Sequence, residues 1–184
     1  MRNLIEKMLI VFWSPFNMIL VISSKFIQYH HLSFFLSAIP FRIGMGIRRQ
    51  FYIKTLKSVG KNFNIYYGAI ISNRDVVIGN NVRIGPYNTI GHCTFGNDVI
   101  LAQNVHILSG RHQHAIDKLN IPINQQKGSL ETVNIGNDVW IGAGSIIMNN
   151  IGSSSIVGAG SVVVKPVQDN IVVAGNPAKT IKQR

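Results

Sequence analysis

Two histidines and two carboxylates stand close together in one polar segment of the chain. The segment, residues 108–134, reads LSGRHQHAIDKLNIPINQQKGSLETVN and contains His112, His114, Asp117 and Glu131. A neutral imidazole is the natural general base near pH 7, and it needs a carboxylate or a carbonyl to orient its other ring nitrogen. Asp117 is the carboxylate nearest in sequence, although the path of the loop decides which group orients which histidine. We therefore predict a general-base site in this segment.

A six-residue repeat flanks the segment on both sides. Each hexapeptide can form one short strand and one turn, and three of them make a triangular coil that buries its apolar side only when coils stack. The repeat predicts a mainly β fold, a parallel β-helix of about five coils. The inward positions of the fifteen repeats are Val59, Ile65, Ile71, Ile78, Ile84, Ile90, Phe95, Leu101, Ile107, Ile135, Ile141, Ile147, Ile151, Val157 and Val163.

The candidate histidines lie where this repeat is interrupted. From Ile107 to Ile135 the period stops for 28 residues, where a single step would be six. Long excursions from a rigid scaffold are usually functional. We therefore divide the chain into a helical, apolar N-terminal segment (1–58), a β-helix (59–169) with an active-site loop (108–134), and a short C-terminal tail (170–184).

Charge is concentrated at the N-terminal end. The formal net charge is +11, and residues 1–75 contain ten Lys and Arg but only two acids, a net of 10 − 2 = +8. Residues 8–24 carry no charge, but Pro15 and Asn17 interrupt them, which disfavours a membrane span. Apolar and aromatic residues beside Lys and Arg favour an interfacial helix on anionic lipid. A signal peptide, or helices that only cover the main domain or pack in an oligomer, are the competing interpretations.

The remaining composition narrows the class of protein. The basic chain has no helix-turn-helix, RNP or zinc pattern, so we expect no nucleic-acid partner. A single cysteine, Cys93, allows no internal disulfide and fits a reducing compartment. Its place in the repeat predicts a buried side chain that packs in the core rather than a nucleophile. These features favour a cytoplasmic protein, peripheral on the inner face of the plasma membrane.

Three segments resemble a known family. VNIGNDVWIGAGSII (133–147), IVGAGSVVVKPV (156–167) and VVAGNPAKTIKQR (172–184) make residues 59–184 similar to the hexapeptide-repeat acetyltransferases, of the maltose, galactoside and colanic-acid polysaccharide type. The resemblance implies a left-handed β-helix and a homotrimer. It also implies that acetyl-CoA lies in a groove between neighbouring coils, and that a loop histidine reaches in from an adjacent subunit.

The resemblance also assigns roles to residues. His112, in Ser-Gly-Arg-His, matches the catalytic base, with His114 as the alternative, and Trp140 matches an aromatic residue beside the active site. Asn88 falls near an acceptor-side asparagine. The positions expected to bind the cofactor are Gly142 and Ala143 at the thioester, Gly158, Ala159 and Gly160 along pantetheine, and Lys165 and Lys179 near the nucleotide phosphates.

The implied reaction moves an acetyl group from acetyl-CoA to a sugar hydroxyl, in surface polysaccharide or lipid-linked oligosaccharide synthesis, with no metal. An antibiotic acceptor is an alternative within that reaction. A second alternative is a zinc enzyme similar to the γ-class carbonic anhydrases, with His92, His106 and His112 or His114 as ligands at a subunit boundary. A third is a non-catalytic trimeric scaffold on a membrane.

Overall fold

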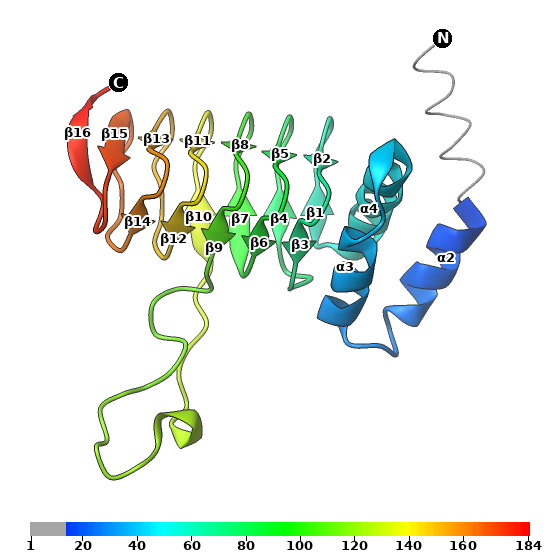
Figure 1. The fold of residues 1–184 in the computed structure, drawn as a ribbon, viewed down its shortest axis with the longest axis horizontal. Coiled ribbons are helices and arrows are strands. Elements are labelled where there is room, and N and C mark those ends of the chain that lie inside the picture. The colour runs from blue at the N-terminus through cyan, green and yellow to red at the C-terminus, as the bar shows by residue number, and fades with distance from the viewer. Residues whose placement is uncertain (1–13) are drawn as a thin grey trace.

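The computed structural model describes residues 14–184, which form three helices followed by a long triangular β-solenoid (Figure 1). The helices are α2 (Ser14–Ser23), α3 (Tyr29–Ser37) and α4 (Phe41–Thr55), and a 3-10 turn η1 (Ile123–Gln125) lies in the long loop. The helical character predicted for the N-terminal segment is confirmed over these residues. Its first 13 residues lie outside the described part of the chain.

Short strands build the three sides of the solenoid, and every neighbouring pair but the last is parallel. The sheets have the orders β1-β4-β7-β10, β16-β15-β13-β11-β8-β5-β2 and β14-β12-β9-β6-β3, so each side gains one strand per coil. The strands are β1 (Ser58–Val59), β2 (Asn64–Ile65), β3 (Ile70–Ile71), β4 (Val77–Ile78), β5 (Arg83–Ile84), β6 (Thr89–Ile90), β7 (Cys93–Phe95), β8 (Ile100–Leu101), β9 (His106–Ile107), β10 (Val133–Ile135), β11 (Trp140–Ile141), β12 (Ile146–Ile147), β13 (Ile156–Val157), β14 (Val162–Val163), β15 (Ile171–Ala174) and β16 (Lys179–Gln183).

The six-residue pattern defines the core. All fifteen predicted inward positions are buried except Val59, which is partly covered. Bridges place Ile151 against Ile135 and Val167 against Ile151, so the first side continues beyond β10. The predicted β-helix is therefore confirmed, with five coils and a partial sixth that contains Val167 and Val173.

A ladder of polar side chains holds one corner of the prism together. The backbone N–H of Asn80 donates to Asn97 Oδ1, and that of Asn97 donates to Asn137 Oδ1, both at 2.8 Å. The ladder continues from the N–H of Asn137 to Ser153 Oγ at 3.1 Å, and from the N–H of Ser153 to Asp169 Oδ1 at 2.6 Å. Each side chain satisfies a turn N–H of the preceding coil, which fixes the stacking distance at the turns.

The N-terminal helices cover the open end of the first coil. The backbone N–H of Ile71 donates to Ser33 Oγ on α3 at 3.1 Å and to Tyr52 O–H on α4 at 3.3 Å, and Gly68 N–H donates to the carbonyl of Ser37 at 2.9 Å. These contacts satisfy a sheet edge that would otherwise be exposed to other strands. Among the helices of residues 14–184, none combines the length and apolar character that crossing a bilayer requires.

The C-terminal residues, expected to be a tail, extend the solenoid instead. β15 pairs in parallel with β13, and β16 folds back antiparallel on β15. Arg184 then donates to Asp138 Oδ2 at 2.6 Å, which fastens the end of the chain to an earlier coil. The Arg184 guanidinium lowers the pKa of the Asp138 carboxyl.

Candidate active site

The interrupting loop stands on a narrow neck that leaves β9 and returns to β10 (Figure 1). Glu131 N–H donates to the carbonyl of Ser109 at 2.9 Å, and Ser129 N–H donates to that of His112 at 2.8 Å. His114 and Lys127 form an antiparallel bridge one step further out. The neck is thus a short two-stranded ribbon, which fixes the backbone of both candidate histidines.

His112 and Glu131 face each other across this neck. His112 Nδ1 lies 3.0 Å from Glu131 Oε1, and the two side chains are 69% and 50% exposed. Gly110 makes the approach possible: it has φ +81°, and a Cβ there would lie 2.6 Å from Glu131 Cβ. A carboxylate that accepts from Nδ1–H leaves Nε2 as the basic atom, and no described group hydrogen-bonds that Nε2. This is the arrangement that a general base requires.

The predicted partner Asp117 is wrong for this histidine. Asp117 is exposed beyond the neck and forms no hydrogen bond or ion pair within the described residues. Sequence distance misled because the antiparallel neck brings residue 112 opposite residues 129–131. The sequence does contain a signal for the correct partner. Gly110 lies three residues after Ile107, and Glu131 lies four residues before Ile135. Similar distances from the two ends of the interrupted repeat are expected for the two strands of an antiparallel neck. The ring of His114 is exposed and makes no hydrogen bond within the described chain.

Trp140 lies on the outer face of the seven-stranded sheet. It is 53% exposed and pairs in register with Ile100 on one side and Ile156 on the other. Ile100 is 44% exposed. Together these three residues form an apolar stripe on the outer surface of the prism, so the Trp140 side chain is not part of the buried core.

The corner that follows Trp140 presents backbone rather than side chains. Gly142 N–H donates to the carbonyl of Val157, and Gly160 N–H donates to that of Ala143, both at 2.8 Å. A Cβ on Gly142 would lie 2.5 Å from the nitrogen of Ala159, so only glycine lets these coils approach. Gly160, at φ +68°, has open space around it. The predicted cofactor positions in this region, with Gly158, are thus brought together along one edge.

The two predicted phosphate-binding lysines lie near the C-terminal end of the prism. Lys165 and Lys179 are both exposed, and neither forms an ion pair within residues 14–184. Lys165 lines a cavity of about 250 Å³ together with Val173 and Thr180. Thr180 follows Lys179 on β16.

Asn88, the residue expected on the acceptor side, lies inside the prism. It is fully buried, its Nδ2 donates to the carbonyl of Ala102 at 3.0 Å, and its Oδ1 accepts from Val105 N–H at 2.6 Å. The side chain therefore braces a turn between coils. The acceptor-side role that the resemblance implied for Asn88 stays a prediction.

Two further histidines, His92 and His106, lie on the coils and not on the loop. His92 Nε2 lies 2.6 Å from Asn73 Nδ2, and His106 pairs in register with Thr89 and Ile146 on the five-stranded sheet. Over residues 14–184, no three His, Cys, Asp or Glu side chains are grouped so that they could hold a metal ion.

Comparison with known proteins identifies acyltransferases among the relatives of this chain. No protein-family model matches the chain. An acetyltransferase of Dictyostelium discoideum, whose own assignment is provisional, is 39% identical over 130 residues, which are 68% of this chain and 56% of that protein. The chain therefore spans little more than half the length of this curated relative.

Solved structures share the fold. A maltose O-acetyltransferase from Clostridium difficile superposes with a TM-score of 0.74 and 27% identity, over 90% of this chain and 88% of that one. The N-acyltransferase AntD from Bacillus cereus, in complex with dTDP and 3-hydroxybutyryl-CoA, gives 0.55 and 26%, over 70% and 84%. A hexapeptide-repeat acetyltransferase from Vibrio cholerae, at 0.65 and 18% over 84% and 89%, supports the fold alone.

The solenoid is consistent with the left-handed β-helix that the sequence resemblance implied. The fold agrees with these solved structures over 70–90% of the chain. The chain is thus a hexapeptide-repeat β-solenoid whose relatives in sequence and in structure are acyltransferases.

Proposed function

We propose that this protein transfers an acetyl group from acetyl-CoA to a hydroxyl of a sugar. The observation that carries the proposal is the His112–Glu131 pair, held at 3.0 Å on the one loop that interrupts a rigid solenoid. The relatives support the same reaction class: one is named for O-acetyl transfer to maltose, and AntD was solved with an acyl-CoA.

The chemistry follows from the geometry of the pair. Glu131 holds Nδ1–H, and Nε2 of His112 takes the proton of the acceptor hydroxyl. The hydroxyl oxygen attacks the thioester carbonyl carbon, a C–O bond forms, and the C–S bond breaks as the tetrahedral intermediate collapses. The imidazolium returns the proton to the departing thiolate, which leaves as CoA thiol. A backbone N–H on the edge near Gly142 and Ala143 would stabilise the oxyanion.

We place acetyl-CoA along that same edge. A backbone edge without bulky side chains, at Gly142, Ala143 and Gly158–Gly160, fits a thin pantetheine arm that exchanges hydrogen bonds with peptide groups. Trp140 stands beside the thioester end. Lys165 and Lys179, both exposed near the C-terminal coil, would meet the nucleotide phosphates.

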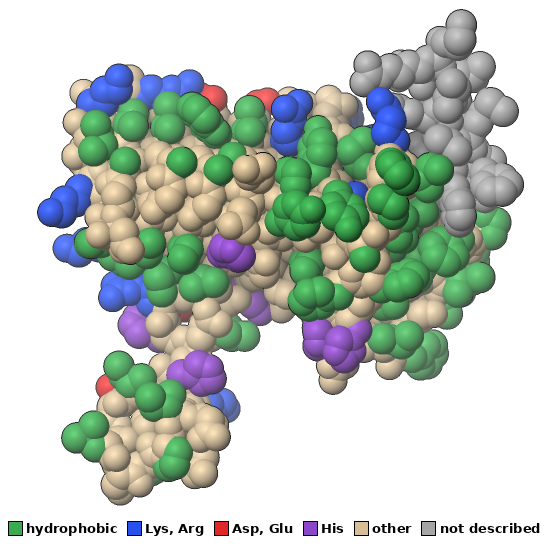
Figure 2. Space-filling view, viewed as in Figure 1, with side chains coloured by type: hydrophobic (Ala, Val, Ile, Leu, Met, Phe, Trp, Pro, Cys, Tyr) green, Lys and Arg blue, Asp and Glu red, His purple; other side chains and the backbone are tan. Residues whose placement is uncertain are grey.

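The working unit in this proposal is a homotrimer. The loop stands off its own prism as a separate lobe, and the tip carries apolar side chains that are largely exposed: Ile116 (68%), Leu119 (100%) and Ile123 (57%) (Figure 2). An apolar tip at the end of an arm fits against a second copy of the chain better than against water. A neighbouring subunit would then receive His112 beside the stripe that contains Trp140.

The acceptor is proposed to be part of a surface polysaccharide or a lipid-linked oligosaccharide, built at the cytoplasmic face of a membrane. The basis is the basic, apolar N-terminal segment: Met18, Ile19 and Phe26 are 61%, 61% and 84% exposed on and beside α2. Failure of the protein to bind vesicles of anionic lipid would contradict this placement.

Calorimetric titration with acetyl-CoA tests the reaction class without knowledge of the acceptor. Saturable binding near one site per chain is expected, in wild type and in His112→Ala alike. In transfer assays on a panel of sugar acceptors, His112→Ala should lower turnover by about 10²–10⁴-fold. His114→Ala is the matched control and should change turnover little. Full turnover in His112→Ala, or absence of acetyl-CoA binding by folded trimer, would refute the proposal.

A further inference from the structure

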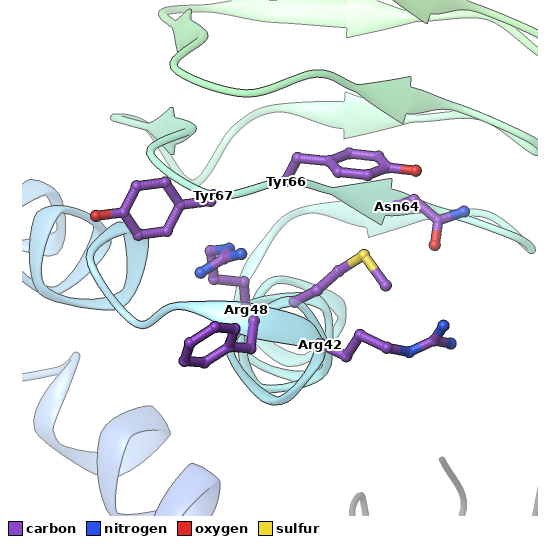
Figure 3. A pocket seen from close by; sticks show the side chains of 7 residues that line it. Arg42, Arg48, Asn64, Tyr66 and Tyr67 are labelled. Atoms are coloured by element: carbon purple, nitrogen blue, oxygen red, sulfur yellow. The ribbon is translucent and has the colours of Figure 1, made fainter. Parts of the chain in front are cut away.

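A hollow of about 580 Å³ lies between α4 and the first coil of the solenoid, away from the loop histidines (Figure 3). In Figure 3, Arg48 rises from α4 beneath Tyr66 and Tyr67, and Arg42 lies below Asn64. The acyl-transfer proposal uses no residue of this hollow. Its lining consists of Phe41, Arg42, Met45, Arg48, Asn64, Tyr66 and Tyr67.

Arg48 is a buried cation at the floor of this hollow. It is 1% exposed, and its Nη1 donates to the carbonyls of Leu36 at 3.0 Å and Ile39 at 2.8 Å, at the C-terminal end of α3. Its Nε is buried and has no hydrogen-bond partner within residues 14–184. These carbonyls are neutral, so they orient the guanidinium, and no carboxylate among residues 14–184 forms an ion pair with it.

No carboxylate of residues 14–74 supplies a counter-ion for Arg48. Residues 14–74 contain eight Lys and Arg and no Asp or Glu. Within the described chain, the carboxylates that pair with basic side chains are Glu131 and Asp138, both far along the solenoid. A buried charge without a partner is costly, so an anion seated in the hollow would relieve an existing penalty.

The walls of the hollow are apolar and aromatic. Phe41 is 85% exposed and has φ +62°, a left-handed conformation that is strained for a bulky residue. Met45, Tyr66 and Tyr67 complete the apolar lining. A strained, exposed aromatic beside a buried cation fits a ligand that carries both an anionic group and a hydrocarbon body.

The neighbouring surface has the same mixed character. Phe34 and Phe35 on α3 are 57% and 55% exposed, and exposed Lys25 and Lys54 lie in the turn after α2 and on α4. Aromatic and aliphatic side chains mixed with cations suit the headgroup region of an anionic membrane. This surrounding surface favours a phospholipid over a small soluble anion.

We propose that the hollow between α4 and the first coil binds the phosphate of an anionic phospholipid. Arg48 and Arg42 hold the phosphate oxygens, and the glycerol and first methylenes of the lipid lie against Phe41, Met45 and Tyr66. This inference sharpens the proposed membrane contact into a defined headgroup site. It does not depend on acetyl transfer.

The test compares lipid binding by two variants, each of which lacks one positive charge of α4. Arg42→Gln removes a cation that lines the hollow, and Lys54→Gln removes an exposed cation of α4 that does not. Calorimetry with a water-soluble short-chain phosphatidic acid should give saturable binding to the trimeric protein. Arg42→Gln should weaken that binding about tenfold, because it removes a charge-assisted hydrogen bond, while Lys54→Gln should change it less than about twofold.

Further ligands separate the sources of phosphate. The short-chain phosphatidylcholine should bind weakly, since choline offsets the phosphate charge, and inorganic phosphate should bind far more weakly than phosphatidic acid. Inorganic phosphate that binds as well as the lipid would overturn the lipid assignment. Equal losses in Arg42→Gln and Lys54→Gln would show a diffuse electrostatic surface and overturn the site.

Two controls keep the result interpretable. Arg48→Met removes the buried cation but also its bonds to the end of α3, so Tyr66→Leu, which alters only the wall, is measured beside it. Both should weaken lipid binding in protein that retains its circular dichroism spectrum, and unchanged binding in both would contradict the proposal. Acetyl-CoA titration of the same samples reports the transferase site separately, so failure of either proposal is distinguishable from failure of the other.

Discussion

Removing the charge of Glu131 provides the sharpest test of how His112 is oriented. Glu131→Gln keeps the size of the side chain and an oxygen that can accept from His112 Nδ1–H. It removes only the negative charge that stabilises the imidazolium formed when the hydroxyl loses its proton. Because Glu131 touches His112 and not the reacting atoms, we expect a positioning effect on turnover.

The magnitude follows from the distance and the exposure of the pair. Two unit charges at the 3.0 Å that separates Nδ1 from Oε1 interact by about 1.4 kcal/mol in water. The side chains are 69% and 50% exposed, so screening and lost side-chain entropy reduce this to at most ~1 kcal/mol. Since ~1.4 kcal/mol is a tenfold rate change, Glu131→Gln should lower kcat by about threefold to fivefold.

The assay is steady-state transfer from acetyl-CoA, with kcat and KM measured separately. We expect kcat to fall while KM for acetyl-CoA stays the same, since Glu131 lies on the loop neck and not on the proposed cofactor edge. In the His112→Ala background, Glu131→Gln should cause no further loss, because its effect passes through the imidazole. Glu131→Asp should recover part of the activity if its shorter carboxylate still reaches Nδ1.

Asp117→Asn is the matched control, a carboxylate of the same loop with no contact to His112. It should leave kcat within about twofold of wild type. The reasoning fails if Asp117→Asn costs as much as Glu131→Gln, or if Glu131→Gln still lowers activity in the absence of the imidazole.

Three further predictions concern the solenoid. Ile84→Ala, at a fully buried inward position, should lower the free energy of unfolding by about 2–5 kcal/mol in urea titrations, whereas Ile181→Ala, at a position 62% exposed, should cost less than about 1 kcal/mol. Equal costs would contradict the inward assignment. Cys93 is 1% exposed, and burial raises the pKa of its thiol. A disulfide reagent at neutral pH should therefore label this thiol only as fast as the protein unfolds. Rapid labelling of folded protein would show that the thiol is accessible. Because Arg184 lowers the pKa of the Asp138 carboxyl, the pair adds stability above the ordinary aspartate pKa of about 3.9 and loses it as pH falls through the lowered value. The Tm difference between wild type and Asp138→Asn should therefore be present at neutral pH and vanish in strong acid, and a difference that persists there would contradict this linkage.

The repeat was readable from the sequence because it is a local pattern. An inward residue such as Ile84 is buried by its own hexapeptide and by the equivalent residues of the two adjacent coils, Ile65 and Leu101, which obey the same period. The fold, the buried Cys93 and the position of the loop follow from that period without knowledge of distant contacts. The partial sixth coil was missed because Val167 and Val173 continue the stack where the sequence repeat weakens.

The chemistry of individual side chains depended on contacts that no local pattern encodes. Asn88 stands in a segment that resembles an acceptor site, but the turn on which it lies points its amide into the prism, where Ala102 and Val105 occupy it. The buried charge of Arg48 is likewise invisible in a helix that reads as basic and amphipathic.

The sequence by itself determined that this protein is a hexapeptide solenoid with a histidine-bearing loop, because a six-residue period specifies burial residue by residue. Only the tertiary structure decided that Glu131, not Asp117, orients His112, and that a cationic hollow opens between α4 and the first coil. Those pairings depend on how an antiparallel neck closes and on how a helix docks against the end of a prism. Both are set by contacts between segments far apart in the chain, which the order of residues does not fix.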